Sequence, residues 1–380
     1  MQRAYLDNSA TTRPCEAAIA AMERCLREEW YNPSAVYKPS VEAFRALRDA
    51  RQRLLNAVGG GGCDAIYTSG GTESNNLAIL GAVGRMRGRQ VLAVSAVEHP
   101  SVRAAFDLLS ERGHDVRVIG VDGAGQLKWD ELEAALDDGA SLVSCMQVNN
   151  ETGALLDAAR LRDTVAGRAL IHVDGVQGFL RVPFDMRLAD LYTVSSHKLH
   201  GPKGVGALIA KKGLRLAPQH VGGGQESNLR SGTENTPGIA GMDAAIGELI
   251  ALGGDMPRQL MAKKLRLMEA VRRVVPDVTV NGPAPEEGAP HILNLGFPGV
   301  RGEVMLHALE GEGVYVSTGS ACSSRKLKVS GVLTAMGIPP RTAEWAVRFS
   351  LSPHTTVEEI DYAASRIGVL YDQLKRFQRR

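Results

Sequence analysis

The sequence lacks long apolar runs and closely spaced cysteines. No apolar stretch reaches the ~18 residues of a membrane-spanning helix, and residues 1–14 lack the apolar centre of a secretory signal. The five cysteines, at positions 15, 25, 63, 145 and 322, form no close pair such as CxxC. This scatter argues against a disulfide framework and against a zinc site. We therefore expect a protein of the reducing cytoplasm that contacts no membrane and holds no metal.

An excess of charge of one sign is also missing. The 44 Lys and Arg residues nearly balance the 42 Asp and Glu residues, so the net charge is only +2. This small value gives no global case for nucleic-acid binding, and the basic end at 375–380 favours a solvated helix terminus. With 380 residues, of which 44% are apolar, the chain is long enough for a globular protein of two domains.

Short apolar runs alternate with amphipathic stretches between residues 65 and 210. This alternation predicts a mostly parallel sheet with helices on both faces, and such sheets bind ligands beyond the carboxyl ends of their strands. The predicted strands are 65–69, 91–95, 116–119, 142–148, 169–173, 191–195 and 206–210, and the predicted helices are 73–86, 101–111, 130–136 and 158–166.

The regular alternation of strands and helices stops after a predicted helix at 237–252, which ends at Gly253-Gly254. The elements predicted beyond it are a helix at 258–274, short strands at 278–280, 292–295, 314–317 and 347–351, and a last helix at 357–377. Few strands with interspersed helices indicate a smaller α+β domain.

Three polar residues follow predicted strands of the large sheet. Lys198 could be nucleophilic where a crevice desolvates its amine, although a lone lysine is more often a loop residue in solvent. Asp174 could keep a pyridinium nitrogen protonated, or it could equally cap a helix. His99 could stack on a planar cofactor and move protons, whereas an isolated histidine is more often structural.

Three further segments carry candidate chemistry. Residues 68–76 pass from a strand through glycines into a helix, which suits either an anion or a simple capping box. Cys322 stands in a small, polar and basic segment with Arg325, Lys326 and Lys328, and nearby cations favour the reactive thiolate. Arg348 lies within a strand-like run, where an arginine binds a carboxylate or forms a structural ion pair.

Taken together, the segments resemble the cysteine desulfurases of the NifS/IscS group, within the class V aminotransferase-like branch of fold type I pyridoxal-phosphate enzymes. The resemblance extends from Tyr5 to the last helix and is specific because nine segments occur in order. They are YLDNSATT, TSGGTESNN, VEHPSV, VNNETG, HVDGVQ, SSHKLHGPKG, RSGTEN, STGSACSS and VRFSL. Any one of them alone is weak.

The resemblance implies an α/β fold with a large cofactor domain at 15–255, built on a mostly parallel seven-stranded sheet. It implies a smaller α+β domain made of 1–14 and 256–380, which carries the cysteine segment. The implied reaction converts L-cysteine to L-alanine and leaves the sulfur as a persulfide on Cys322. An acceptor in iron–sulfur cluster assembly or tRNA thiolation would then take the sulfur.

The resemblance also assigns roles to residues of this sequence. Lys198 would bind pyridoxal 5′-phosphate and act as a base, His99 would stack on its ring, and Cys322 would be the nucleophile. The other implied contacts are Asp174 to the ring nitrogen, Gln177 to the ring oxygen, Gly71, Thr72, Ser195 and His197 to the phosphate, Thr233 to the phosphate of a second subunit in a homodimer, and Arg348 and Asn149 to the substrate carboxylate.

Two departures and two alternatives bear on this interpretation. The segment around Cys322 is more basic than in the relatives considered, and the chain ends at Arg380 without the extension that binds an iron–sulfur scaffold. A tRNA-thiolation enzyme therefore becomes a reasonable alternative acceptor. The competing activities are selenocysteine lyase and transamination, and the competing class is a non-catalytic interaction protein. Cys322 argues against a transaminase, and the presence of Lys198, Asp174 and His99 argues against a non-catalytic protein.

Overall fold

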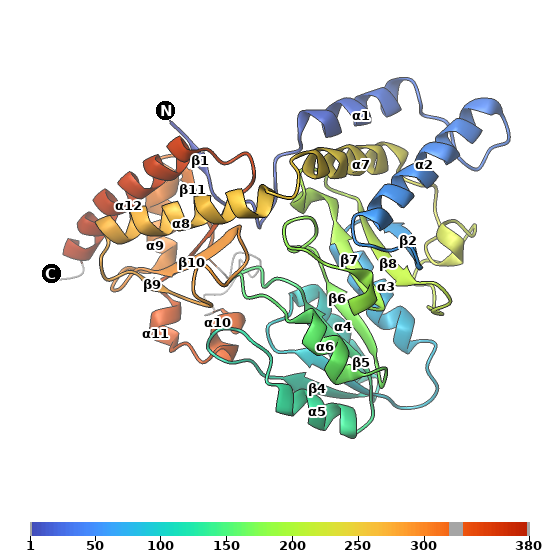
Figure 1. The fold of residues 1–380 in the computed structure, drawn as a ribbon, viewed down its shortest axis with the longest axis horizontal. Coiled ribbons are helices and arrows are strands. Elements are labelled where there is room, and N and C mark those ends of the chain that lie inside the picture. Colours follow the sequence, from blue (N-terminus) through green and yellow to red (C-terminus); the bar gives the residue numbers. More distant parts are fainter. Residues whose placement is uncertain (1, 319–329, 378–380) are drawn as a thin grey trace.

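The computed structural model describes residues 2–318 and 330–377 (Figure 1). In this part of the chain, the large sheet has seven strands in the order β2-β8-β7-β6-β5-β3-β4. Their bounds are β2 Cys63–Thr68, β3 Val91–Ser95, β4 Asp115–Ile119, β5 Ala140–Met146, β6 Leu170–Asp174, β7 Leu191–Ser195 and β8 Gly206–Lys211. β8 runs antiparallel to both of its neighbours and the remaining pairs are parallel. The predicted fold class, a mostly parallel seven-stranded sheet, is confirmed.

Helices cover both faces of this sheet. Successive strand residues point to opposite sides, and both sides are apolar, so each face needs a cover. Ala93 and Val143 belong to one hydrophobic core, while their neighbours Leu92 and Leu142 belong to another. The first core packs against α2 Lys38–Asn56, α5 Trp129–Asp137, α6 Ala158–Val165 and α7 Thr236–Ala251, and the second packs against α3 Gly71–Val83 and α4 Pro100–Glu111. α1 Glu16–Arg27 lies along α7 (Figure 1).

A separate core forms around a small antiparallel sheet of order β12-β10-β9. Its strands are β9 Thr279–Val280, β10 Ile292–Gly296 and β12 Ala346–Ser350, and its helices are α8 Met256–Val274, α9 Gly302–Gly311 and α12 Val357–Phe377. The chain start joins this core, because β1 Ala4–Tyr5 pairs in parallel with β11 Val314–Tyr315 and buries Ala4 and Leu6. Figure 1 shows that blue strand among orange and red elements. The boundary near residue 255 stays a prediction.

Two short helices precede β12. They are α10 Gly331–Ala335 and α11 Pro340–Ala343. Val332 of α10 and the following Met336 pack into the core of the large sheet, although the chain around them belongs to the other sheet. No helix of the described ranges is long and apolar enough to cross a membrane.

The backbone of the large sheet is most closely approached at Gly206, which lies beside Gly70. A Cβ on Gly206 would lie 2.6 Å from the Val194 carbonyl oxygen and 2.7 Å from Gly70 Cα. We predict that Gly206→Ala lowers the free energy of unfolding by roughly 1–3 kcal/mol, because the strands must move apart. Urea denaturation followed by circular dichroism measures this loss.

Gly247→Ala provides the matched control, because this helical glycine in α7 has no neighbouring atom within 4 Å of an added Cβ. We expect this control to be neutral or slightly stabilising, since alanine favours helices over glycine. Equal midpoints for Gly206→Ala and the wild type would show that the close approach is not rigid.

Candidate active site

A cavity of about 880 Å³ lies beyond the carboxyl ends of β6 and β7, where the strand and helix alternation predicted a ligand site. It collects nine of the residues that the sequence nominated, from elements far apart in the chain. They are Gly71, Thr72, His99, Asp174, Gln177, Ser195, His197, Lys198 and Arg348. Ser9 and Ala10 of the N-terminal segment close one side of the cavity.

Asp174 is the last residue of β6 and is buried, with only 5% of its surface exposed. One carboxylate oxygen accepts from the side-chain amide of Asn75 at 2.9 Å, and the other accepts from the Val176 backbone N–H at 3.0 Å. These two donors fix the orientation of the carboxylate at the end of the strand. The residue does bond a backbone N–H two positions on, as a capping residue would, and it also lines the cavity.

Lys198 ends a short 3-10 helix, Ser196–Lys198, that follows β7 directly. Its ammonium nitrogen donates to the carbonyl oxygens of Ser9 at 2.6 Å and Ala10 at 2.7 Å. The N-terminal segment therefore holds the lysine at the cavity wall. This position differs from that of a loop lysine in solvent.

His99 is half-buried and stands at the N-cap of α4. Its ring nitrogen Nδ1 accepts from the Ser101 backbone N–H at 3.2 Å and lies 2.8 Å from the Ser101 hydroxyl. Burial lowers the pKa of His99, with Lys198 adding to the effect and Asp174 opposing it. The imidazole is therefore neutral near pH 7.

The start of α3 offers an anion site. Gly70 is its N-cap, no side chain caps the helix, and Glu73 instead accepts from the Ser69 backbone N–H at 2.8 Å. The N–H groups of the first turn are thus available to a phosphate. A Cβ on Gly71 would lie 2.9 Å from a Val176 methyl group, so only glycine leaves this approach open.

Ser195, His197 and Gln177 lie around the same space. His197 Nδ1 is 3.2 Å from the Thr11 hydroxyl, and burial, helped by Lys198, lowers the pKa of His197 to about 4. It is therefore a neutral partner at pH 7. The Gln177 amide donates to the Ser9 carbonyl oxygen at 2.9 Å and its oxygen accepts from Arg181 at 3.2 Å.

Arg348 lies in the middle of β12 and is almost fully buried. Its guanidinium donates to Asp7 at 2.7 Å and to the Asn150 carbonyl oxygen at 2.9 Å. The Arg348 Nε atom has no hydrogen-bond partner among the described residues. The arginine thus forms the structural ion pair considered from sequence, and it also lines the cavity.

Glu151 and Glu98 line the cavity and were not nominated from the sequence. Burial raises the pKa of Glu151 to about 7, although Ser330 donates to its carboxylate at 2.5 Å and Arg348 lies nearby. Burial also raises the pKa of Glu98 well above its usual range, with Asp174 adding to the effect. The available signal was their position in the motifs VEHPSV and VNNETG: Glu98 adjoins His99, and Glu151 lies two residues after Asn149.

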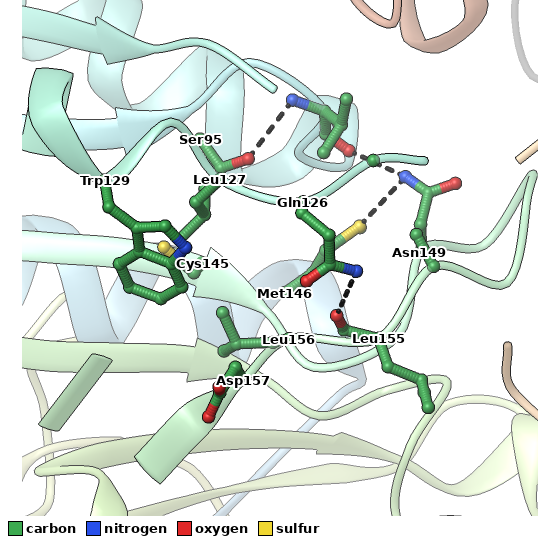
Figure 2. Close-up of a pocket in the computed structure, with 13 residues that line it drawn as sticks. Ser95, Gln126, Leu127, Trp129, Cys145, Met146, Asn149, Leu155, Leu156 and Asp157 are labelled. Atoms are coloured by element: carbon green, nitrogen blue, oxygen red, sulfur yellow. Dashed lines mark hydrogen bonds between the residues drawn. The ribbon is translucent and has the colours of Figure 1, made fainter. Parts of the chain in front are cut away.

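Asn149, expected at the substrate carboxylate, lies behind the main cavity. Its amide donates to the Val97 carbonyl oxygen at 3.1 Å and to Met146 sulfur at 3.3 Å, and its oxygen accepts from the backbone N–H groups of Glu151 and Thr152. Figure 2 shows it beside a second cavity of about 20 Å³, too small for an amino acid. Asn149 therefore shapes the turn that carries Asn150 and Glu151.

Two other nominated residues are not brought to this cavity. Thr233 is exposed and is not among the residues that line it in the same chain. Cys322 lies outside the described residues, together with Arg325, Lys326 and Lys328. The residues next to that range are placed: Ser317 pairs its backbone with Arg348, and Ser330 bonds Glu151.

The cavity fits pyridoxal phosphate. Its donors and acceptors match the chemistry of that group: a buried carboxylate for a protonated ring nitrogen, a lysine for the aldehyde carbon, and a helix N-terminus for the phosphate. The glycine at 71, where a Cβ would be crowded, provides the close backbone approach that a phosphate needs.

Comparisons with known proteins agree with this fit. The family profile "Aminotransferase class-V" matches residues 4–363. The chain is 36% identical to a cysteine desulfurase of Trichormus azollae over 98% of this chain and 93% of that protein. It is also 36% identical to the cysteine desulfurase NifS of Azotobacter vinelandii, over 99% of this chain and 94% of that protein.

A solved structure titled "NIFS-LIKE PROTEIN" superimposes with a TM-score of 0.90 and is 32% identical, covering 98% of this chain and 100% of that one. The sheet order, the cavity and the profile match thus agree over nearly the whole chain. The chain belongs to the class-V aminotransferase family of pyridoxal-phosphate enzymes, with cysteine desulfurases among its relatives.

Proposed function

We propose that this protein is a cysteine desulfurase, which converts L-cysteine to L-alanine and carries the sulfur on Cys322. The observation that carries the proposal is the convergence of Lys198, Asp174 and Arg348 in one cavity. The chain that forms this cavity is similar to cysteine desulfurases in sequence and to a NifS-like protein in structure. The first two residues fit the cofactor, and the third fits the carboxylate of an amino acid.

The residues that would hold pyridoxal phosphate come from the start of α3 and from the segments that end or follow β3, β6 and β7. We assign Lys198 to the aldehyde carbon, Asp174 and Gln177 to the ring, His99 to its face, and Gly71, Thr72, Ser195 and His197 to the phosphate. When bound, the cofactor withdraws electrons from the α-carbon of an amino acid and so acidifies its C–H bond. Thr233 is exposed on its own chain, which suits a contact with the phosphate of a second copy in a homodimer.

Three side chains then perform the binding and proton transfer. Arg348, which lines the cavity and pairs with Asp7 there, binds the substrate carboxylate through its guanidinium group. Lys198, as the neutral amine, accepts the α-proton, and the carbonyl oxygens of Ser9 and Ala10 then accept hydrogen bonds from the resulting ammonium group. His99, held neutral by burial, supports the ring face and can pass a proton at Nε2.

Sulfur transfer requires the Cys322 thiolate. It forms a bond to the substrate sulfur while the substrate C–S bond breaks, and the electron pair of that bond stays on carbon, which takes up a proton. Cys322 sulfur is oxidised to a persulfide and the substrate carbon is reduced, giving L-alanine. In the sequence, four residues separate Cys322 from Ser317, whose backbone pairs with that of the cavity-lining Arg348.

The sulfur then passes to a protein acceptor in the cytoplasm. The basic residues at 325, 326 and 328 suit an acceptor with acidic groups around its thiol. The two pathways considered, iron–sulfur cluster assembly and tRNA thiolation, are distinguished by tracing labelled sulfur from the persulfide-loaded enzyme into captured partners.

Replacing the lysine tests cofactor binding. We predict that Lys198→Ala loses the covalent link and with it both the yellow colour of the purified enzyme and all measurable alanine formation. Absorption spectra after addition of pyridoxal phosphate measure this change. Lys203→Ala, an exposed lysine of the same segment, is the control and should keep colour and activity. A yellow, active Lys198→Ala enzyme would contradict the assignment.

Replacing the cysteine tests the nucleophile. We predict that Cys322→Ala lowers the rate of alanine formation from L-cysteine at least 100-fold, because no thiolate remains to accept sulfur. The colour of the enzyme should be unchanged, so that cofactor binding and sulfur transfer are separated. Cys25→Ala, a buried cysteine of α1, is the control. Alanine formation at the wild-type rate would rule out the desulfurase mechanism with Cys322.

The buried carboxyl beside Ser330 predicts a pH effect on stability. The raised pKa of Glu151, about 7 instead of 4.5, means that the folded protein binds this proton more tightly than the unfolded chain. Its stabilising contribution is therefore complete below pH 4.5 and is lost as the pH rises to 7. We expect the melting temperature of the wild type to fall relative to that of Glu151→Gln across this window.

Differential scanning fluorimetry at several pH values measures the difference, with Glu287→Gln at an exposed position as control. A constant difference between wild type and Glu151→Gln from pH 4.5 to 7 would show that the carboxyl does not titrate there.

A further inference from the structure

Four polar side chains form a continuous row in the wall of the cofactor cavity. The Asn75 amide lies 2.9 Å from Asp174 Oδ2 and 2.9 Å from Ser101 Oγ, and Ser101 Oγ lies 2.8 Å from His99 Nδ1. Asn75 comes from α3, Ser101 from α4 and Asp174 from β6. The row therefore joins the carboxylate assigned to the ring nitrogen with the imidazole assigned to the ring face.

The direction of each hydrogen bond in this row follows from chemistry. An ionised carboxylate only accepts, so Asn75 must turn its NH₂ group toward Asp174. The same NH₂ group then donates its second hydrogen to Ser101 Oγ. The Ser101 hydroxyl, which accepts there, has its own proton left for His99 Nδ1.

The backbone supports the same direction at the histidine. Ser101 N–H donates to His99 Nδ1 at 3.2 Å, so this nitrogen already accepts one bond and must carry a lone pair. Two donors therefore converge on Nδ1. The ring proton of a neutral His99 is then on Nε2.

We propose that Ser101 and Asn75 are positioning residues that hold His99 as the neutral Nε2–H tautomer. The Asn75 amide group donates both to Ser101 and to Asp174, and so links the two sites. This inference rests on the proposed function, since it gives the tautomer of an imidazole that the proposal assigns to catalysis. A proton on Nδ1 would face the Ser101 backbone N–H, donor against donor, and the Ser101 hydroxyl would have to turn its own proton away. The row thus opposes the imidazolium form and directs the single N–H of the ring away from α4.

The electrostatic surroundings agree with this arrangement. Burial lowers the pKa of His99, Lys198 lowers it further and Asp174 raises it. The titratable and charged groups that share the cavity with His99 are Glu98, Arg103, Glu151, Asp174, His197, Lys198 and Arg348.

A purely structural role for Ser101 is the alternative. A serine near a helix start usually caps it, but here His99 is the N-cap and accepts the Ser101 backbone N–H itself. The serine hydroxyl is therefore not needed for the cap. Removing it should leave α4 in place and change the state of the imidazole.

The test is Ser101→Ala in the cofactor-loaded enzyme with ¹⁵N-labelled histidine. The ring resonances of His99, assigned with His99→Asn, report its tautomer and its titration. We expect the wild type to show Nε2–H only, and Ser101→Ala to show a mixture whose imidazole titrates higher by about one pH unit, because one donor to Nδ1 is lost. Asn75→Ala should shift it in the same direction.

Activity provides the second readout. We expect Ser101→Ala to lower kcat for alanine formation by roughly tenfold with little change in KM, and to move the acidic limb of the pH profile upward. Ser101→Thr keeps the hydroxyl and should restore both. Ser110→Ala, at the exposed far end of α4, is the matched control and should behave as the wild type.

The outcomes separate this inference from the proposed function. An active enzyme in which Ser101→Ala leaves the tautomer, titration and pH profile of the wild type would overturn the inference and leave the desulfurase proposal standing. If the loaded protein formed no alanine, the ¹⁵N spectra alone would still decide the inference. A wild-type enzyme with Nδ1–H as its main tautomer would also contradict it.

Discussion

The site depends on six residues near the chain start, from Asp7 to Thr12, which lie between the two cores. The carbonyl oxygens of Ser9 and Ala10 accept hydrogen bonds from the Lys198 ammonium group, and the Asp7 carboxylate forms an ion pair with Arg348. Thr12 N–H donates to the His197 carbonyl oxygen at 2.8 Å. The segment is anchored by β1, which pairs with β11 in the smaller core. One short segment thus orients both the cation assigned to the cofactor and the cation assigned to the substrate.

Much of the fold could be predicted because a parallel sheet needs apolar strands at regular intervals. The strands at 91–95 and 191–195 and the helix at 357–377 were predicted with the bounds that the structure shows. α1 and α2 were missed, because α1 buries mainly alanines and α2 buries a narrow stripe among many charged residues. The reversal of β8 could not be predicted either, since direction depends on the turn at 201–205 and not on strand composition.

Site residues could be predicted from the sequence where they stand at the ends of strands. They could not be predicted where only the packing of helices brings them together. Lys198, Asp174 and His99 follow strands whose carboxyl ends meet at one edge, so their shared cavity was expected from topology. Asn75 and Ser101 belong to different helices, and no spacing reveals that their side chains meet. Asn149 illustrates the reverse case: its motif pointed to substrate, yet its amide is occupied in the turn below the cavity. The roles of all these residues in the reaction stay predictions.

The central claim is that sulfur leaves cysteine and is held on one thiol of this chain. It is tested most directly by incubating the cofactor-loaded enzyme with sulfur-labelled L-cysteine, trapping persulfides and locating the label by peptide mass spectrometry. The account predicts one extra labelled sulfur on the peptide that contains Cys322 and equimolar L-alanine. Alanine formed with the label absent from Cys322, or present on one of the four buried cysteines instead, would contradict it.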